Sequence, residues 1–260
     1  MRQFRLSRLL PGTLALAGIM MLGLASSARA DLEIWASTSD GTNNNPPLSS
    51  DSLGVSVPSG GTTSFNGTVG TFAIDTLTTS SNSPGNGVLS FLSGATVHVQ
   101  NTGASTETLY LSLGDTGFTL PTAPPAVILR SHVEGSVFVP SSANALTFQS
   151  YLNESDTQNA NSGISFGPQT VNTTFIHAFL DDQPLTVGTV TAPFSLTEQF
   201  AITLGGTVGG VPNSGGEIEL TTVTQLSPTS VPEPSSLVLA GIGALGMIGY
   251  GLRRRKARGA

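Results

Sequence analysis

Leu109-Tyr110-Leu111-Ser112-Leu113 is the stretch that decides the fold class, because leucine occupies every second position in it. Successive side chains of a β-strand point to opposite faces, so this pattern buries the three leucines on one face of a sheet. The same alternation recurs in further segments: Phe72 and Ile74; Val97 and Val99; Val127, Leu129 and Val133; Leu146, Phe148 and Leu152; Leu196, Phe200, Ile202 and Leu204; Ile218 and Leu220. No convincing helical period occurs between residues 31 and 228. The sequence therefore predicts an all-β domain.

Turn-forming residues separate these segments, since the chain contains 31 glycines and 16 prolines. Short alternating strands with turns between them are typical of an antiparallel β-sandwich, and we predict one over residues 31–228, with jelly-roll or immunoglobulin-like topology. Residues 175–180 are apolar on both faces, which predicts a central strand buried on both sides. We expect loops at 39–50, 80–87 and 205–216, the last as a long hairpin tip.

The predicted domain is strongly acidic. Between residues 31 and 230, Arg130 is the only Lys or Arg, against fifteen Asp and Glu residues, which gives a formal net charge of −14. Binding of nucleic acid through phosphate contacts is excluded, because it needs clustered Lys and Arg. The chain has no cysteine, which excludes disulfides, thiolate metal sites and a cysteine nucleophile.

Residues 1–30 have the three parts of a secretory signal peptide. Arginines at positions 2, 5 and 8 form a basic start, an apolar segment follows over residues 14–24, and Ala28 and Ala30 supply the small residues of a signal peptidase site. We therefore expect signal peptidase and the general secretion machinery as partners, and a mature protein that begins at Asp31. An uncleaved N-terminal anchor is the alternative.

The C-terminal residues 231–260 also have three parts. Pro232, Glu233 and Pro234 form an extended and accessible motif, because proline fixes φ and removes a backbone donor. Residues 237–252 carry no charge and predict a transmembrane helix of about 24 Å, which is short for a hydrocarbon core of about 30 Å. A basic stop-transfer cluster follows, made of Arg253, Arg254, Arg255, Lys256 and Arg258. This cluster favours an orientation with the preceding domain outside the cell.

This tripartite tail resembles the PEP-CTERM sorting signal of Gram-negative bacteria, in which a Pro-Glu-Pro triplet, a Gly-rich apolar helix and an Arg cluster occur in this order. The resemblance covers residues 231–260 only. It implies recognition by exosortase, a membrane enzyme thought to cut near the motif, and association with exopolysaccharide or biofilm-matrix systems. An ordinary C-terminal membrane anchor after a proline-rich linker is the alternative.

Two short motifs are also found in enzymes. Residues 163–167 match G-x-S-x-G, but a nucleophile elbow needs a strand that turns into a helix, and Pro168 follows here instead. Asp115-Thr116-Gly117 occurs in aspartic proteases, whose chemistry needs two such carboxylates, and the chain has no second triplet of this kind. We expect a turn there, with an Asx-type hydrogen bond and Gly117 at positive φ.

Metal and cofactor sites are not predicted. His98, His132 and His177 lie far apart without metal-ligand spacing, and His177 is expected to be a hydrogen-bonded core residue. Several acidic or amide residues could bind calcium in loops, although none has EF-hand spacing and solvated side chains are expected: Asp181, Asp182, Glu154, Asp156, Asp40 and Asn44. Arg130 is expected to form an ion pair with one of the many acids.

The sequence favours an exported, non-enzymatic surface or biofilm-matrix protein, structural or adhesive, that passes through an inner-membrane stage to the cell surface. The first alternative is a carbohydrate-binding module for the matrix exopolysaccharide, for which Trp35, Tyr110 and Tyr151 are the candidate aromatic contacts. A secreted hydrolase acting through Asp115 or Ser165 is the second alternative.

Overall fold

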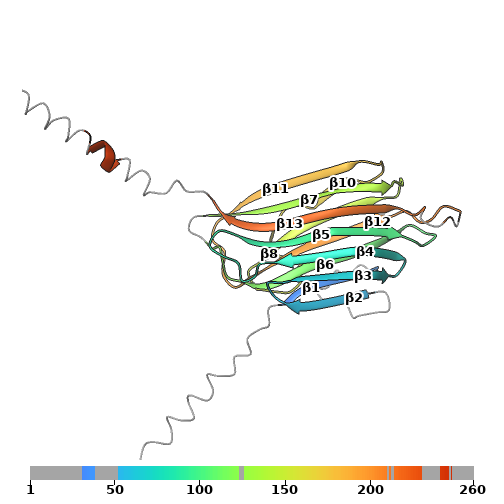
Figure 1. Ribbon diagram of the computed structural model, residues 1–260, viewed down its shortest axis with the longest axis horizontal. Helices are drawn as coiled ribbons and strands as arrows, with labels where there is room; N and C mark the ends of the chain where they lie inside the picture. The colour runs from blue at the N-terminus through green and yellow to red at the C-terminus, as the bar shows by residue number, and fades with distance from the viewer. Residues whose placement is uncertain are drawn as a thin grey trace, which may run out of the picture.

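The computed structural model describes residues 31–38, 52–122, 126–209, 211, 214–229, 241–245 and 247. Strands within these ranges form two antiparallel sheets that pack face to face (Figure 1). The prediction of an all-β domain with antiparallel sheets is confirmed. Asp40 and Asn44, and the whole loop predicted at 39–50, lie outside the described residues.

Sheet A contains seven strands. In spatial order they are β10 (Gln169–Asn172), β8 (Ala145–Asn153), β12 (Phe194–Leu204), β6 (Glu107–Phe118), β1 (Asp31–Ser37) and β2 (Ser52–Pro58), with β9 (Ile164–Ser165) paired to β8. Sheet B contains six strands. In spatial order they are β11 (Ala178–Val187), β7 (Val127–Val139), β13 (Glu217–Pro228), β5 (Ser90–Asn101), β4 (Phe72–Ser81) and β3 (Thr62–Val69).

Eight of these strands follow the jelly-roll order, which resolves the choice that the sequence left open. In chain order the eight are β5 to β8 and β10 to β13. The first strand, β5, pairs with the last, β13, which also pairs with β7, and β7 pairs with β11. In the other sheet β6 pairs with β12, β12 with β8, and β8 with β10. The remaining strands β1 to β4 extend both sheets on one side, beside β6 and β5.

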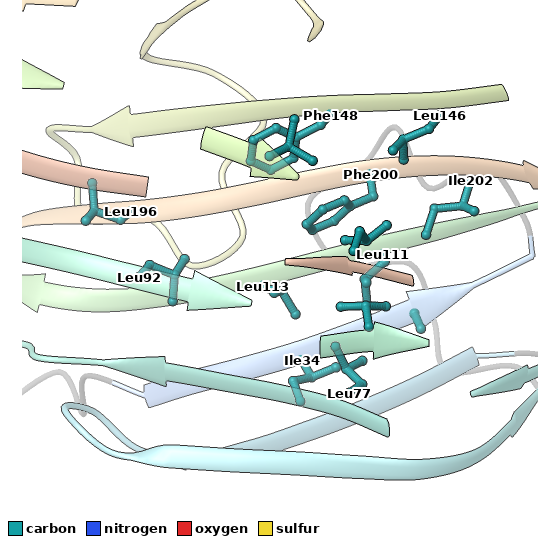
Figure 2. Packing of buried hydrophobic residues seen from close by; sticks show 14 of the residues in the cluster. Ile34, Leu77, Leu92, Leu111, Leu113, Leu146, Phe148, Leu196, Phe200 and Ile202 are labelled. Carbon is teal, nitrogen blue, oxygen red and sulfur yellow. The ribbon is translucent and has the colours of Figure 1, made fainter. Parts of the chain in front are cut away.

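The core lies between the sheets and is built by the alternation seen in the sequence. Leu109, Leu111 and Leu113 of β6 are buried, and Figure 2 shows Leu111 and Leu113 together with Leu77 and Leu92 of sheet B. All the alternating apolar residues named from the sequence are also buried. Removing such a side chain from water contributes about 1.5–3 kcal/mol each, so this face of every strand specifies its register.

The prediction of a central strand at residues 175–180 is wrong. The strand β11 begins at Ala178 and is the outer strand of sheet B, and Phe175, Ile176 and Leu180 are 68%, 72% and 66% exposed. Apolar residues on both faces indicate burial only where other elements cover both faces. Here the segment lies at the edge of the sandwich, next to β7 alone among the described strands.

Two predicted loops differ from the structure. Residues 205–216 connect β12 in sheet A with β13 in sheet B, so they cross between the sheets and do not form a hairpin tip. The loop predicted at 80–87 begins two residues later in the structure than predicted, because β4 continues to Ser81. Its backbone pairing with β5 reaches Ser81, opposite Leu92.

The start of β1 and the end of β13 lie at the same end of the sandwich (Figure 1). Pro228 and Val187 both pair with Val127 of β7, so β13 and β11 finish at the same end of the sandwich with β7 between them. Ala178, at the start of β11, pairs with Ser136 of β7, which also pairs with Glu219 near the start of β13, so Ala178 lies toward the opposite end. We call these the tail end and the distal end.

Candidate functional site

The residues predicted for export and sorting lie outside the described residues: Ala28 and Ala30; Pro232, Glu233 and Pro234; Arg253, Arg254, Arg255, Lys256 and Arg258. Within the predicted transmembrane segment 237–252, residues 241–245 and 247 are helical. No helix in the described part of the chain is long and apolar enough to cross a membrane. The signal peptide, the sorting site and the membrane span stay predictions.

Asp115-Thr116-Gly117 lies inside β6, so the predicted turn is wrong. The register between β6 and β12 shifts at this point, which marks a β-bulge, and Gly117 has the expected positive φ of 77°. The backbone N–H of Thr116 donates to Asp115 Oδ1 over 2.8 Å, and that of Gly60 donates to Oδ2 over 3.3 Å. Burial raises the pKa of Asp115. Its carboxylate thus satisfies buried backbone donors and ties β6 to the β2–β3 turn.

Ser165 belongs to the two-residue strand β9, where it pairs with Tyr151 of β8. Gln149 Nε2 donates to Ser165 Oγ over 3.4 Å and to the carbonyl oxygen of Phe166 over 2.7 Å. The residues after Ser165 do not form a helix, since β10 begins at Gln169. This geometry differs from the strand-turn-helix of a nucleophile elbow, as expected from Pro168.

His98 is held between two carboxylates on the outer face of sheet B. Its Nδ1 lies 2.9 Å from Asp75 Oδ2, and its Nε2 lies 2.8 Å from Glu217 Oε1. The centroid of its ring lies 6.0 Å from the centroid of the Phe138 ring. Partial burial acts to lower the pKa of His98, but the hydrogen bonds to Glu217 and Asp75 outweigh it and raise the pKa. The His98 ring therefore connects β4, β5 and β13.

The other two histidines do not join this cluster. His132 Nε2 lies 3.6 Å from Glu134 Oε2 on β7. His177 is only partly buried, and its Nδ1 donates to the carbonyl oxygen of Phe175 over 2.8 Å, so the prediction of a core position is wrong. Among the described residues, no group of three or more histidine or acidic side chains is arranged to hold a metal ion.

The acidic residues considered for calcium binding make separate contacts. Asp182 forms an ion pair with Arg130, with 3.2 Å between Arg130 Nε and Asp182 Oδ1, which confirms the ion pair expected for Arg130. Glu154 Oε1 accepts from the backbone N–H of Thr191 over 2.7 Å, and Asp156 Oδ1 accepts from that of Gly117 over 2.8 Å. Asp181 Oδ2 accepts from the side chain of Gln183 over 3.1 Å. These carboxylates stabilise strands and loops.

The aromatic residues Trp35, Tyr110 and Tyr151 all lie on the outer face of sheet A, where they alternate with buried core residues. Trp35 is nevertheless only 8% exposed, and its indole Nε1 has no hydrogen-bond partner among the described residues. The chain after β8 covers it: Asn159 donates to Glu33 Oε2 and accepts from Ser112 Oγ, which flank Trp35 in β1 and β6. Trp35 is therefore not an exposed platform for a sugar.

Glu198 is a fully buried carboxylate that the sequence analysis missed. It lies on β12 between Leu196 and Phe200, on the face that points into the core, and this alternation was the signal that could have found it. The Thr222 hydroxyl donates to Glu198 Oε2 over 2.6 Å, whereas Oε1 has no hydrogen-bond partner among the described residues. Burial raises the pKa of Glu198 to about 7, and the hydrogen bond from Thr222 opposes this shift.

A line of polar side chains crosses the core beside Glu198. Thr224 Oγ1 lies 2.6 Å from Ser150 Oγ, which lies 2.7 Å from Ser131 Oγ, and the Ser131 hydroxyl donates to Gln169 Oε1 over 2.6 Å. The four residues belong in turn to β13, β8, β7 and β10, so the line alternates between the two sheets. Buried hydrogen bonds of this kind fix the alignment of one sheet on the other.

A second feature that the sequence analysis missed is an exposed apolar surface at the distal end. We call residues Phe175–Leu180 the edge segment; three of its large side chains are exposed, and Phe138 of β7 is 45% exposed nearby. Figure 1 shows β11 at the outer edge of sheet B. Adjacent large apolar side chains on an exposed sheet edge indicate an interaction surface, because both the side chains and the backbone can be covered by a partner. The edge segment is the candidate functional site of the described domain.

Comparison with solved structures finds partial likenesses at low similarity. The chain resembles a galactotriose complex of the carbohydrate-binding module TmCBM61 (8% identity, TM-score 0.28, 56% of this chain and 85% of that one). It also resembles the K1 cleaved adhesin domain of Lys-gingipain from Porphyromonas gingivalis (13% identity, TM-score 0.29, 66% of this chain and 100% of that one). A third likeness is to the arabinose-bound α-L-arabinofuranosidase MgGH51 (13% identity, TM-score 0.31), where the match covers 52% of this chain and 20% of the enzyme. None of these is close enough to assign a ligand or an activity.

No curated protein matches the chain. The comparison with protein families gives a match to one short region. Residues 230–256 match the PEP-CTERM protein-sorting motif, directly after the last strand of the domain ends at Pro228. The chain therefore carries a PEP-CTERM sorting motif, as the Pro-Glu-Pro triplet, the apolar segment after it and the basic cluster indicated.

Proposed function

We propose that the protein is an exported structural or adhesive component of the cell surface or biofilm matrix, sorted through its C-terminal motif. The observation that carries this proposal is the match of residues 230–256 to the PEP-CTERM protein-sorting motif. Signal peptidase would remove residues 1–30, and exosortase would recognise Pro232, Glu233 and Pro234. The apolar segment and the basic cluster would hold the protein in the inner membrane until it is processed.

The positions of the two ends of the domain are consistent with a C-terminal membrane tether. Its first strand begins and its last strand ends at the tail end, at Asp31 and Pro228. While the tail holds the protein in the membrane, the distal end of the domain would therefore face away from the membrane. The contacts described above use Asp115, Glu154 and Asp156 to bind backbone N–H groups, which is a structural role. We therefore propose that the domain acts without catalysis.

Replacing Pro232, Glu233 and Pro234 together with alanine tests the sorting step. We expect the variant to remain full-length in the inner membrane, because the processing enzyme no longer finds its motif. Wild-type protein should instead appear outside the inner membrane. Cell fractionation with detection of the domain measures both, and equal distribution of the two forms would contradict the proposal. Replacing Pro228, which lies before the motif, with alanine is the control.

Carbohydrate binding is the second candidate, and the outer face of sheet A is its surface. Tyr151 and Tyr110 lie on this face with partly exposed rings, while the amide nitrogens of Gln149 and Gln199 donate to the carbonyl oxygens of Phe166 and Ala160. Aromatic rings stack on sugars, so the two tyrosine rings carry this candidate. If the domain binds matrix exopolysaccharide here, Tyr151→Ala should weaken retention on that polysaccharide, whereas Phe175→Ala, just before β11 of the other sheet, should not.

A further inference from the structure

We propose that residues 154–163 form a lid over a closed binding site for a neutral sugar chain, with the ring of Trp35 at the base of the site. This inference rests on the carbohydrate-binding candidate and gives it a specific site and a ligand class. Trp35 lies on the outer face of sheet A, yet it is only 8% exposed, because the chain after β8 covers it. The site is therefore closed in this structure.

Unpaired polar atoms gather where the lid meets the sheet. Trp35 Nε1, Thr197 Oγ1 and Gln158 Oε1 are buried and have no hydrogen-bond partner among the described residues. All three residues lie around Gly114 of β6. Thr197 and Glu33 both pair with Gly114, and Trp35 follows Glu33 by two residues on the same face of β1. From the lid, Gln158 Nε2 donates to the carbonyl oxygen of Gly114 over 2.8 Å. A donor, an acceptor and a hydroxyl left unpaired around one point indicate a site that a polar ligand completes.

The lid is held closed by hydrogen bonds more than by apolar packing. Asn159 fastens it to two strands: its Nδ2 donates to Glu33 Oε2 over 3.0 Å, and its Oδ1 accepts from Ser112 Oγ over 3.2 Å. Ala160 is the only hydrophobic residue within residues 154–163. Water can replace such hydrogen bonds at small net cost, and segments that bury little apolar surface are the ones that open locally. The lid can therefore open while the sandwich stays folded.

Closing the lid has costs that opening removes. The unpaired polar atoms regain water as a partner when the lid opens. Burial raises the pKa of Glu33, and the charge of Asp31 acts in the same direction, so the closed form disfavours ionised Glu33. Asp156 and Asn159 of the lid have φ angles of 52° and 50°, which residues other than glycine seldom adopt. Exposure of the Trp35 ring to water opposes opening. A ligand that covers the opened ring therefore shifts the balance to the open form.

The chemistry of the opened site selects a neutral sugar. The indole ring of Trp35 offers an apolar surface for the C–H face of a sugar ring, and its N–H can donate to a sugar hydroxyl. The Thr197 hydroxyl can donate or accept. The carboxylates of Glu33 and Asp31 accept from hydroxyl groups but repel an anionic sugar, and the formal net charge of −14 over residues 31–230 acts in the same direction. A chain of neutral hexoses fits these groups, whereas a chain of uronates does not.

The fluorescence of Trp35 reports the lid without a label, because the chain has no other tryptophan. The sample is the full chain, solubilised in a detergent that has no sugar headgroup. Asn159→Ala removes the contacts to Glu33 and Ser112, so the open fraction should rise and acrylamide should quench Trp35 about twofold more strongly than in wild type. Ser162→Ala is the matched control, because Ser162 is an exposed residue of the same lid. Equal quenching of Asn159→Ala and wild type would overturn the lid.

Titration of wild-type protein with neutral oligosaccharides of glucose, mannose and galactose tests the ligand class and needs no variant. At least one of them should change the emission of Trp35. The same sugar should bind Asn159→Ala about twofold more tightly, because a larger fraction of the variant is open. An oligogalacturonate of equal length is the anionic control and should leave the emission unchanged. No response to any of these neutral probes, or an equal response to the anionic one, would overturn the site and leave buried water as the partner of the unpaired atoms.

A failure of this site is distinguishable from a failure of the proposed functions. Tyr151 pairs with Thr197, so the exposed tyrosine borders the closed site. If Tyr151→Ala weakens retention on polysaccharide while Trp35 in wild type never responds to sugar, binding occurs on the open face of sheet A and the site beneath the lid is overturned. If neither result is obtained, the carbohydrate-binding candidate fails as well. Sorting is measured separately by fractionation and does not depend on these results.

Discussion

At the scale of single residues, Glu198 has the most unusual environment. Its carboxylate is fully buried between two sheets, one oxygen accepts from Thr222, and the other has no partner among the described residues. An ionised carboxylate in such a place is costly, so the protonated form is favoured and the pKa rises to about 7. Glu198 therefore makes the stability of the domain depend on pH near neutrality.

Glu198→Gln tests this dependence. Because the folded pKa of about 7 exceeds the ordinary value of 4.5, the contribution of Glu198 to stability is greatest below pH 4.5 and is lost as the pH rises to about 7. The loss amounts to about 3 kcal/mol at pH 8, at roughly 1.4 kcal/mol for each pKa unit. Glutamine stays neutral, so the variant should be more stable than wild type at pH 8 and nearly equal at pH 4.

Urea unfolding at both pH values measures this difference. Glu219→Gln, on the outer face of β13, is the control and should leave the pH dependence of the free energy of unfolding unchanged. Parallel pH curves for wild type and Glu198→Gln would contradict the assignment. Asp115 and Glu33 also have raised pKa values through burial, so some pH dependence should remain in the variant.

At the scale of elements, the approach of β5 to the other strands depends on Gly94. A Cβ atom at this position would lie 2.6 Å from Thr222 Oγ1 and 2.7 Å from Leu113 Cδ1, so these two side chains would have to move out of their packed positions. We expect Gly94→Ala to lower the free energy of unfolding by about 1–3 kcal/mol, the usual cost of overpacking.

Gly87→Ala is the matched control for this substitution. Gly87 lies in the β4–β5 connection, and a Cβ atom there would meet nothing within 4 Å. Its replacement should change the free energy of unfolding by less than about 1 kcal/mol, because only the unfolded chain is affected. Thermal or urea unfolding of both variants checks the pair. Equal destabilisation by the two substitutions would contradict the close approach at Gly94.

The elements also show how far the sequence could predict the fold. Period-two alternation correctly predicted that Leu109, Leu111 and Leu113 lie in the core, because a strand with one buried face needs an apolar residue at every second position. Whether a strand is central or at an edge depends on neighbours far away in the chain, and for this reason residues 175–180 were assigned wrongly. The jelly-roll order also follows from such distant pairings, for example between β5 and β13.

The candidate sites divide in the same way. Alternation could have placed Glu198 in the core, but the partners that make a buried carboxylate tolerable, such as Thr222, come from another sheet. The sequence does not decide which face of β1 carries the ring of Trp35. The structure shows that the ring lies on the outer face of the sheet and is covered there. The sorting motif was readable from the sequence because its parts are contiguous: residues 230–256 match as one linear signal.

At the scale of the whole molecule, a β-sandwich lies between two terminal segments that are expected to direct its location. The first strand begins at Asp31, directly after the predicted signal peptidase site at Ala28 and Ala30. We expect the exported protein to begin at Asp31. N-terminal sequencing of the exported form checks this, and detection of residues 1–20 in it would show that the signal peptide is retained as an anchor.

The central claim is that the PEP-CTERM tail is a processing signal and its helix a temporary tether. The intact mass of wild-type protein recovered from outside the inner membrane tests this claim most directly. The account predicts a mass that lacks the basic cluster Arg253, Arg254, Arg255, Lys256 and Arg258, because cutting near Pro232, Glu233 and Pro234 removes everything after the motif. A mass that still includes this cluster at the final location would contradict the account and identify the tail as a permanent anchor.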